Sequence, residues 1–263
     1  MIPKVIHYIW FSDKDTLPEK VESCIQSWKK CMPDYDIVKW NEKNFDVKKA
    51  PIYVQEAFQE KKYAFVSDYV RLWVLYNYGG IYMDTDVETF KSFDELLDNK
   101  AFSGFEEIHK VSAWLFASEK GNPIFKEFME DYDNRRFILG EGKYDTTPNP
   151  FPITKRLVNH GLELDGKLQR LESITIYPMD YFCPFNPYRA GSDCFSDNTY
   201  CSHHFDGAWI KHKNENEKKY LEEEKNYIKI FGSKYGEKIH KHIAIINHMG
   251  IYGWIKRFLI KRN

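Results

Sequence analysis

The sequence predicts an α/β protein with a mixed, mainly parallel central sheet flanked by helices and followed by a helical C-terminal appendage. Short β-rich apolar runs alternate with amphipathic helical patterns along the chain. The first elements run strand, helix, strand, helices, strand, an order that suits right-handed crossovers between parallel strands. Towards its C-terminus the chain becomes charged and helical. We therefore expect one main domain over residues 1–210 and a helical extension over residues 211–263.

The first half of the main domain has the clearest periodicity. Its expected elements are the strand Lys4–Phe11, a helix from Pro18 to just before Pro33, the strand Tyr35–Trp40, helices over Ile52–Lys62 and Phe65–Tyr78, and the strand Ile81–Glu88. The third helix is apolar nearly all round, which indicates deep burial. It is expected to end at Gly79 and Gly80, because glycine accepts a left-handed C-cap.

The second half has weaker signals. We expect strands at Ala101–Glu106, Ser112–Ser118 and near Ser173–Met179, and a helix at Gly121–Tyr132 that Asn122 and Pro123 open. The segment Asp145–Pro152 is expected to be irregular, because its prolines remove backbone donors and restrict the residues before them. Such a loop could line a ligand cleft.

Composition excludes several classes of function. The 263 residues are 43% hydrophobic and 29% charged, as in an ordinary globular protein. The formal net charge of -1 argues against a nucleic-acid partner. Five cysteines without a C-x-x-C pair fit a reducing compartment. The chain shows no signal-peptide pattern and no apolar run of spanning length, so we expect a cytoplasmic protein.

Asp84 and Asp86 follow a buried strand and stand one residue apart. Because two close carboxylates repel each other, an oxygen-seeking divalent cation such as Mn²⁺ or Mg²⁺ would make the pair favourable. Ligands of open α/β sheets also gather beyond the carboxyl ends of the strands. Two solvated turn aspartates are the plain alternative. A calcium loop reaching Glu95 is disfavoured, because Thr89 stands where such a loop needs glycine.

The segment Ala64–Glu88, "AFVSDYVRLWVLYNYGGIYMDTDVE", joins S-D-x-x-R, G-G-x-Y and D-x-D in one short stretch. It resembles the core signature of the retaining GT-A glycosyltransferases with a sugar-binding DXD motif. The resemblance is greatest to glycosyltransferase family 32, which includes capsular polysaccharide transferases and mannosyltransferases, and extends more remotely to the clostridial glucosylating toxins. It implies a Rossmann-like GT-A fold, a divalent cation and a nucleoside diphosphate sugar as donor.

The resemblance also implies roles for single residues. Asp68 would accept hydrogen bonds from sugar or ribose hydroxyls, and Arg71, three residues on along the helix, would donate to sugar or phosphate oxygens. With Asp84 and Asp86 they form the expected catalytic set. A surface ion pair is the alternative for Asp68 and Arg71. Trp10 resembles the tryptophan that stacks on the nucleotide base, although its sequence context without the resemblance favours a core position.

A second group of candidate site residues lies in the segment "HHFDGAW", His203–Trp209. The spacing from His204 to Gly207 is similar to the H-x-x-G element by which related enzymes add a metal ligand or contact the diphosphate, so His204 is expected to complete the metal site. Trp209 is expected at the donor site. The adjacent pair leaves open whether His203 or His204 faces the aspartates. A zinc site of cysteines with His203 is disfavoured, because close cysteine pairs are absent.

The implied reaction transfers a sugar from a UDP- or GDP-sugar to a hydroxyl of a glycan or lipid-linked oligosaccharide. The resemblance implies retention of anomeric configuration. No residue stands out as a carboxylate nucleophile, so we expect front-face attack. A metal-dependent phosphodiesterase and a non-catalytic carbohydrate-binding protein are the alternatives. The tail 251–263 carries an apolar stripe with only basic charges, which suits contact with the inner face of the membrane or packing on the domain.

Overall fold

The computed structural model describes residues 1–12, 16–187 and 193–206. Met1–Asn186 and Asp193–Asp206 form one compact unit. The predicted boundary at residue 210, the helical extension and the membrane-facing tail all lie outside the described residues. They therefore stay predictions. Within the described part of the chain, no helix is long and apolar enough to cross a bilayer.

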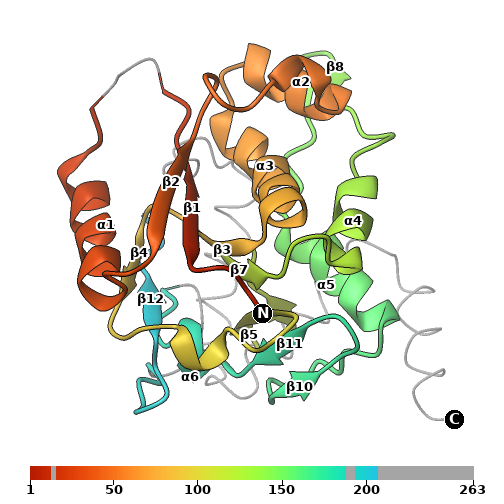
Figure 1. Cartoon of the computed structure of the whole chain (residues 1–263). Coiled ribbons are helices and arrows are strands. Elements are labelled where there is room, and N and C mark those ends of the chain that lie inside the picture. Colours follow the sequence, from red (N-terminus) through yellow and green to blue (C-terminus); the bar gives the residue numbers. More distant parts are fainter. Residues whose placement is uncertain (13–15, 188–192, 207–263) are drawn as a thin grey trace, which may run out of the picture. The chain divides into compact units, whose positions relative to one another are not determined.

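The described unit is built on a central sheet whose strands run in the order β10-β11-β5-β7-β3-β1-β2, with β6 paired to β5 (Figure 1). Strands β1, β2, β3, β5 and β11 point the same way, while β7 and β10 run opposite. This arrangement confirms the predicted mixed, mainly parallel sheet. The strands are β1 (Val5–Ile9), β2 (Asp36–Trp40), β3 (Gly80–Met83), β4 (Val87–Thr89), β5 (Ala101–Glu107), β6 (Lys110–Val111), β7 (Leu115–Ser118), β8 (Ile138–Gly140), β9 (Lys143–Tyr144), β10 (Gln169–Arg170), β11 (Thr175–Tyr177) and β12 (Cys201–His203).

Helices cover the sheet. They are α1 (Glu19–Cys31), α2 (Ile52–Gln59), α3 (Tyr63–Tyr78), α4 (Pro123–Glu130), α5 (Pro150–Asn159) and α6 (Met179–Phe182), with short 3₁₀ turns η1 (Val47–Lys49) and η2 (Asp94–Leu96). Helix α3 packs on β1, β3 and β7, and α4 packs on α3. Tyr82 and Phe116 belong to the apolar cluster that includes residues of α3 and α4, whereas Ile81 and Leu115 belong to the cluster that includes residues of α1. This alternation places a core on each face of the sheet.

Helix α3 ends at Gly79 as predicted, but the ψ angle of -164° places this cap outside the left-handed helical region. Gly79 and Gly80 have φ angles of 71° and 96°, which glycine adopts readily and other residues do not. A Cβ on Gly80 would lie 2.6 Å from the carbonyl oxygen of Val5. The glycine pair therefore lets the buried helix turn directly into a central strand that lies close against β1.

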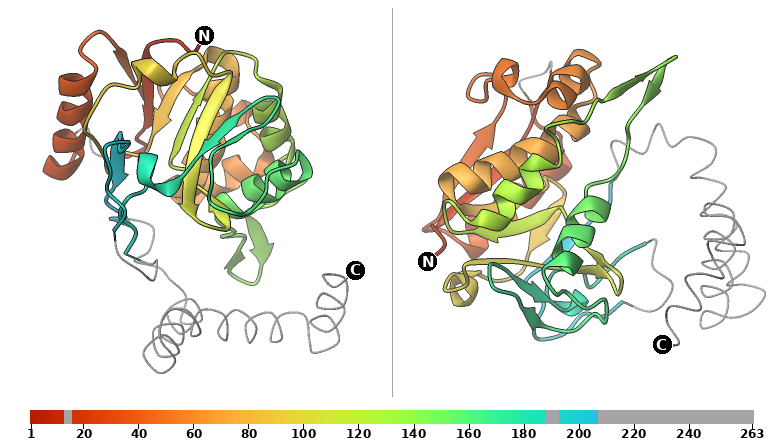
Figure 2. Two further views of the ribbon diagram at one scale, coloured as in Figure 1. Left: turned by 90° about the horizontal axis from the view of Figure 1, so that it is seen from below. Right: turned by 90° about the vertical axis from the view of Figure 1, so that its right-hand side faces the viewer.

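Three stretches differ from the sequence expectation. The strand predicted through Glu88 breaks after Met83, because Asp84–Val87 forms a turn in which Val87 N donates to Asp84 O at 3.2 Å. The predicted irregular segment keeps that character only to Asn149; α5 then begins at Pro150, since proline is favoured in the first helical turn. The β8–β9 hairpin was not predicted, and it projects from the rest of the unit (Figure 2).

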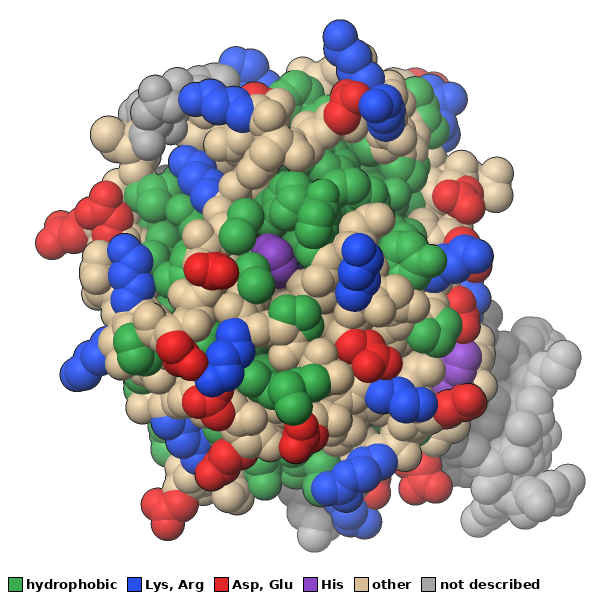
Figure 3. All heavy atoms as spheres, in the orientation of Figure 1, with side chains coloured by type: hydrophobic (Ala, Val, Ile, Leu, Met, Phe, Trp, Pro, Cys, Tyr) green, Lys and Arg blue, Asp and Glu red, His purple; other side chains and the backbone are tan. Residues whose placement is uncertain are grey.

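On the face shown in Figure 3, basic and acidic side chains are interspersed rather than gathered by sign. This distribution agrees with the nearly balanced charge of the whole sequence, 38 basic against 39 acidic residues. An anionic ligand therefore has to be held by a local site rather than by the general field of this face.

Candidate active site

Asp84 and Asp86 lie in the turn that follows β3. Asp84 N donates to Trp114 O at 2.9 Å, which holds the first aspartate at the carboxyl end of the strand. The hydroxyl of Tyr82 donates to the Asp84 carboxylate. Because the chain turns here, the two carboxylates sit at the edge of the sheet where α/β proteins bind their ligands.

A short ladder brings a histidine to this turn. Strand β12 pairs antiparallel with β4, and the register sets His203 opposite Val87. The Nε2 atom of His203 lies 2.9 Å from Oδ1 of Asp86. Ligand atoms of Asp84, Asp86 and His203 all lie within 4.8 Å of one another. A residue 117 positions later in the chain thus joins the two aspartates.

The neighbouring His204 points elsewhere. Its Nε2 atom lies 3.2 Å from the carboxylate of Glu88, and its side chain is 33% exposed against 11% for His203. Only its backbone N contacts the turn, by donating to Asp86 O at 2.9 Å. The geometry favours His203 as the nitrogen ligand, and the predicted role of His204 has no support from the position of its side chain.

His203 is fixed by its surroundings. Its ring stacks on Trp114 with centroids 4.8 Å apart and planes 21° apart. Its Nδ1 atom is buried, and no hydrogen-bond partner for it lies among the residues that the structure describes. Burial alone would raise the pKa of Asp86, but the hydrogen bonds from His203 and from the backbone N of Asp206 outweigh it and lower that pKa below its usual value. The carboxylate of Asp86 therefore stays ionised and ready to bind a cation.

Asp68 and Arg71 lie on α3 and face the same turn. Arg71 Nη2 is 3.0 Å from Asp68 and 3.6 Å from Asp84. Arg71 also donates to Ser67 O at 3.1 Å and to Ala113 O at 2.5 Å. These contacts occupy most of the five N–H donors of a guanidinium. Asp68 and Arg71 therefore form a buried ion pair rather than a surface one. Arg71 contacts both the carboxylate on the helix and the carboxylate of Asp84 in the turn.

The carboxylate of Asp68 is unusually desolvated. Burial raises the pKa of Asp68 to about 6, although the charge of Arg71 opposes this shift. Asn149 holds the helix beside it, because its Nδ2 atom donates to Asp68 O at 2.8 Å. The hydroxyl of Tyr132 in turn donates to Oδ1 of Asn149 at 2.5 Å. A carboxylate that is buried with one cation retains acceptor capacity for ligand hydroxyls.

Several site residues had no clear signal in the sequence. The sequence predicts only that Trp114 belongs to a strand and that Asn149 belongs to a proline-rich loop. Trp10 lies just beyond β1, which runs parallel to β3, and so belongs to the same edge of the sheet. Its Nε1 atom is buried and has no hydrogen-bond partner in the described part of the chain. The predicted stacking of Trp10 on a base stays a prediction, and Trp209 lies outside the described residues.

The side chains at the turn suit a hard divalent cation. Two carboxylates and one imidazole are common ligands of Mn²⁺. Among the residues that the structure describes, the cysteines take no part in such a group, so the alternative zinc site is not formed there. Asp84, Asp86 and His203 would hold the ion.

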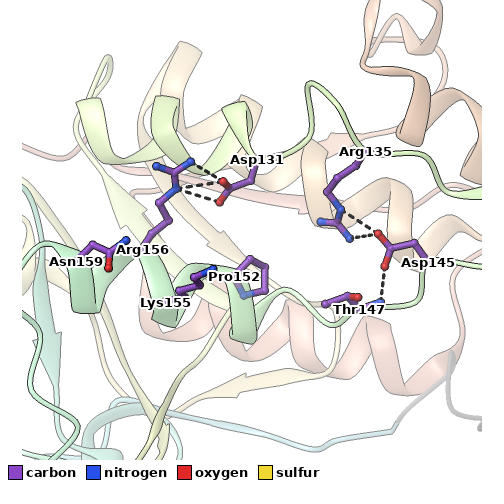
Figure 4. A pocket seen from close by; sticks show the side chains of 8 residues that line it. All are labelled: Asp131, Arg135, Asp145, Thr147, Pro152, Lys155, Arg156 and Asn159. Carbon is purple, nitrogen blue, oxygen red and sulfur yellow. Dashed lines mark hydrogen bonds and ion pairs between the residues drawn. The ribbon is translucent and has the colours of Figure 1, made fainter. Parts of the chain in front are cut away.

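A separate cavity of about 380 Å³ lies beside α5 (Figure 4). Two ion pairs line it: Arg135 lies 2.8 Å from Asp145, and Arg156 lies 2.5 Å from Asp131. The remaining lining residues are Thr147, Pro152, Lys155 and Asn159. Because each arginine is already paired with an aspartate, the cavity carries little uncompensated charge apart from Lys155.

The two histidines allow a direct test of the metal site. Replacing His203 by glutamine is expected to weaken Mn²⁺ binding about tenfold or more, because an imidazole ligand is lost. His204→Gln is the matched control and is expected to bind Mn²⁺ as the native protein does. Titration calorimetry with MnCl₂ measures both. Equal weakening by the two substitutions would contradict the assignment of His203.

The fold and the turn define an α/β protein with a candidate divalent-metal site at the carboxyl edge of its sheet, next to a buried carboxylate–guanidinium pair. Residues 18–103 match the family model described as "Glycosyltransferase sugar-binding region containing DXD motif". This match confirms the resemblance to DXD-containing glycosyltransferases that the sequence predicted. The matched segment contains Asp68, Arg71, Asp84 and Asp86 but ends before His203.

Several proteins that are similar in sequence are also named as glycosyltransferases. The chain is 30% identical over 133 residues to inositol phosphoceramide mannosyltransferase 3 of Schizosaccharomyces pombe, a match covering 49% of this chain and 37% of that protein. It is 24% identical to the uncharacterized glycosyltransferase L373 of Acanthamoeba polyphaga mimivirus, over 81% of this chain and 85% of that one. The chain spans less than half the length of the yeast relatives that it matches.

Among solved structures, the chain is similar to the PaToxG glycosyltransferase. The TM-score is 0.46 at 21% identity, and the match covers 60% of this chain and 69% of that one.

Proposed function

We propose that this protein is a metal-dependent glycosyltransferase that moves a sugar from a nucleoside diphosphate sugar to an acceptor hydroxyl. The observation that carries the proposal is the meeting of Asp84, Asp86 and His203 in one group, with Asp68 and Arg71 beside it. A diphosphate needs a local positive centre, and a sugar needs acceptors for its hydroxyls. The bound cation and Arg71 would meet the first need and Asp68 the second, and of these site residues only His203 lies outside the matched segment.

Each described residue has a role in the proposed reaction. Asp68 accepts hydrogen bonds from hydroxyls of the donor sugar, since its carboxylate is buried with acceptor capacity to spare. Arg71 fixes the carboxylates of Asp68 and Asp84 and adds positive charge near the diphosphate oxygens. The Trp114 ring orients His203 by stacking on it. The contacts are made before the ligand arrives, which lowers the cost of ordering the site.

The divalent ion, when bound, would supply the charge that stabilises the leaving nucleoside diphosphate. We propose transfer with retention by front-face attack, in which the leaving diphosphate takes the proton of the acceptor hydroxyl. Asp68 would position the sugar for this attack rather than bond to it. Detection of a covalent glycosyl adduct on any side chain, by mass spectrometry of the intact protein, would contradict this mechanism.

For the donor we propose a UDP- or GDP-sugar, and for the acceptor a glycan or lipid-linked oligosaccharide, in polysaccharide or glycolipid synthesis. The names of the yeast relatives, which denote mannosyl transfer to an inositol phosphoceramide, support a hexose donor and a glycolipid acceptor. We propose a cytoplasmic location at the inner face of the membrane. The tail 251–263, on which membrane contact would depend, lies outside the described residues.

Calorimetry with a panel of nucleotide sugars tests the proposal. UDP-glucose, UDP-galactose and GDP-mannose are titrated with and without Mn²⁺, and nucleotide release is followed in parallel. At least one donor is expected to bind and to be slowly hydrolysed only with the metal, because the diphosphate and the carboxylates repel each other without it. If the protein neither binds nor hydrolyses any of these nucleotide sugars, a metal-dependent phosphodiesterase or a carbohydrate-binding protein would be favoured instead.

A further inference from the structure

Glu106 lies at the same edge of the sheet as the metal group but on another strand. It stands near the end of β5, which runs in the same direction as β3 and is separated from it by the antiparallel strand β7. Strands β3 and β5 are therefore about 10 Å apart, two strand spacings. Trp114 precedes β7 and contacts both His203 and the backbone of Asp84. Glu106 is thus placed on the far side of Trp114 from Asp84.

The Glu106 side chain is a buried charge with a single cation for a partner. It is 9% exposed, and its Oε1 atom lies 3.2 Å from Lys110 Nζ. Lys110 also contacts Glu107 at 2.7 Å, but Glu107 is 38% exposed. Burial raises the pKa of Glu106, and the charges of Lys110 and His203 oppose that shift.

The end of β5 is held rigidly. Asn186 Nδ2 donates to Glu106 O at 3.3 Å, and Cys183 Sγ contacts the same oxygen at 3.9 Å. On the other side of the hairpin, Val111 N donates to the hydroxyl of Thr154 at 2.9 Å. A buried carboxylate on such a fixed backbone is costly unless its remaining lone pairs find donors. The proposed donor site leaves Glu106 without a role.

We propose that Glu106 binds a hydroxyl group of the acceptor, and that the acceptor part bound there is a neutral polyol. This inference rests on the proposed function. The donor sugar is assigned to Asp68 and Arg71 on α3, which packs on β1, β3 and β7. Glu106 on β5 lies beyond that group of strands, where an attacking hydroxyl can approach. Glu106, Glu107 and Lys110 carry one net negative charge, so a phosphate group would be repelled.

Competition between water and polyols measures this role. The donor that the native protein hydrolyses is supplied together with glycerol, methyl α-mannoside or myo-inositol, and in parallel with mannose 6-phosphate. The native protein is expected to transfer the sugar to at least one neutral polyol in competition with hydrolysis by water. It is not expected to transfer the sugar to mannose 6-phosphate. Glu106→Gln is expected to raise the KM for that polyol about tenfold or more, because a charge-assisted hydrogen bond is lost. Metal-dependent donor binding and hydrolysis in water are expected to stay within about twofold.

Glu107→Gln is the matched control, since it removes the other carboxylate of Lys110 and is expected to leave the polyol KM unchanged. Glu106→Asp, which keeps the charge but shortens the side chain, is expected to fall between native and Glu106→Gln. Thermal unfolding establishes that each variant is folded. The inference is overturned if the native protein diverts no sugar to a neutral polyol, prefers mannose 6-phosphate, or loses donor binding and polyol transfer together in Glu106→Gln. Failure of the native protein to bind any nucleotide sugar would instead contradict the proposed function.

Discussion

Replacing Asp86 by asparagine is expected to reduce metal-dependent sugar transfer at least about a hundredfold. The substitution keeps the shape of the side chain and an oxygen that can accept from His203, but it removes one negative charge from the group of Asp84, Asp86 and His203. A divalent ion and the diphosphate that it neutralises are then held less tightly in the transition state. Initial rates of nucleotide release, measured over a range of MnCl₂ concentrations, give the effect.

Glu88→Gln is the control for this experiment. Glu88 lies on the same β4–β12 ladder, two residues further on, and pairs with His204 rather than with the metal group. It also carries one negative charge, so the general field near the turn changes equally in both variants. We expect the rate of Glu88→Gln to stay within about twofold of the native rate. Similar losses in the two variants would show that only the overall charge matters, contrary to the proposed site.

Replacing Gly80 by alanine is expected to destabilise the fold by about 3 kcal/mol or more. The φ angle of 96° disfavours any residue with a Cβ, and the added Cβ would meet the Val5 carbonyl oxygen at 2.6 Å. That oxygen belongs to β1, the strand that pairs with β3, and cannot move without disturbing the centre of the sheet. Thermal unfolding is expected to show a midpoint lower by about 10 °C.

Gly121→Ala separates backbone strain from steric conflict. Gly121 has a similar positive φ of 78°, but nothing lies within 4 Å of the position that its Cβ would take. Alanine there is expected to cost only about 1 to 2 kcal/mol, the strain of the left-handed backbone itself. If Gly80→Ala destabilised the protein no more than Gly121→Ala, this result would contradict the close contact between β1 and the glycine pair.

The elements with strong apolar periodicity could be predicted from the sequence. The helix that begins after Pro18 and the buried helix ending at Gly79 both form as expected, because burial of an apolar face and a glycine cap are local signals. Asp68 and Arg71 are also brought together by local spacing, three residues apart on one helix. The mainly parallel sheet followed from the order of these elements.

The choice between His203 and His204 could not be predicted in this way. It depends on the register of β12 against β4, two strands of three residues that are more than one hundred positions apart. A shift by one residue would exchange the directions of the two side chains. The position of Trp114 depends likewise on β7 being antiparallel, and the α5 helix was missed because its first turn is rich in proline.

The reversed direction of β7 has a consequence for how such a protein can diversify. Because β7 runs against its neighbours, the connection between β5 and β7 returns at the ligand edge of the sheet, between Glu106 and Trp114. This short connection belongs to neither the turn of Asp84 and Asp86 nor helix α3. Ala113 and Trp114, at the end of this connection, hold Arg71 and Asp84. Under the proposed function, substitutions or insertions before these two residues can therefore alter which compound receives the sugar while the donor site keeps its contacts.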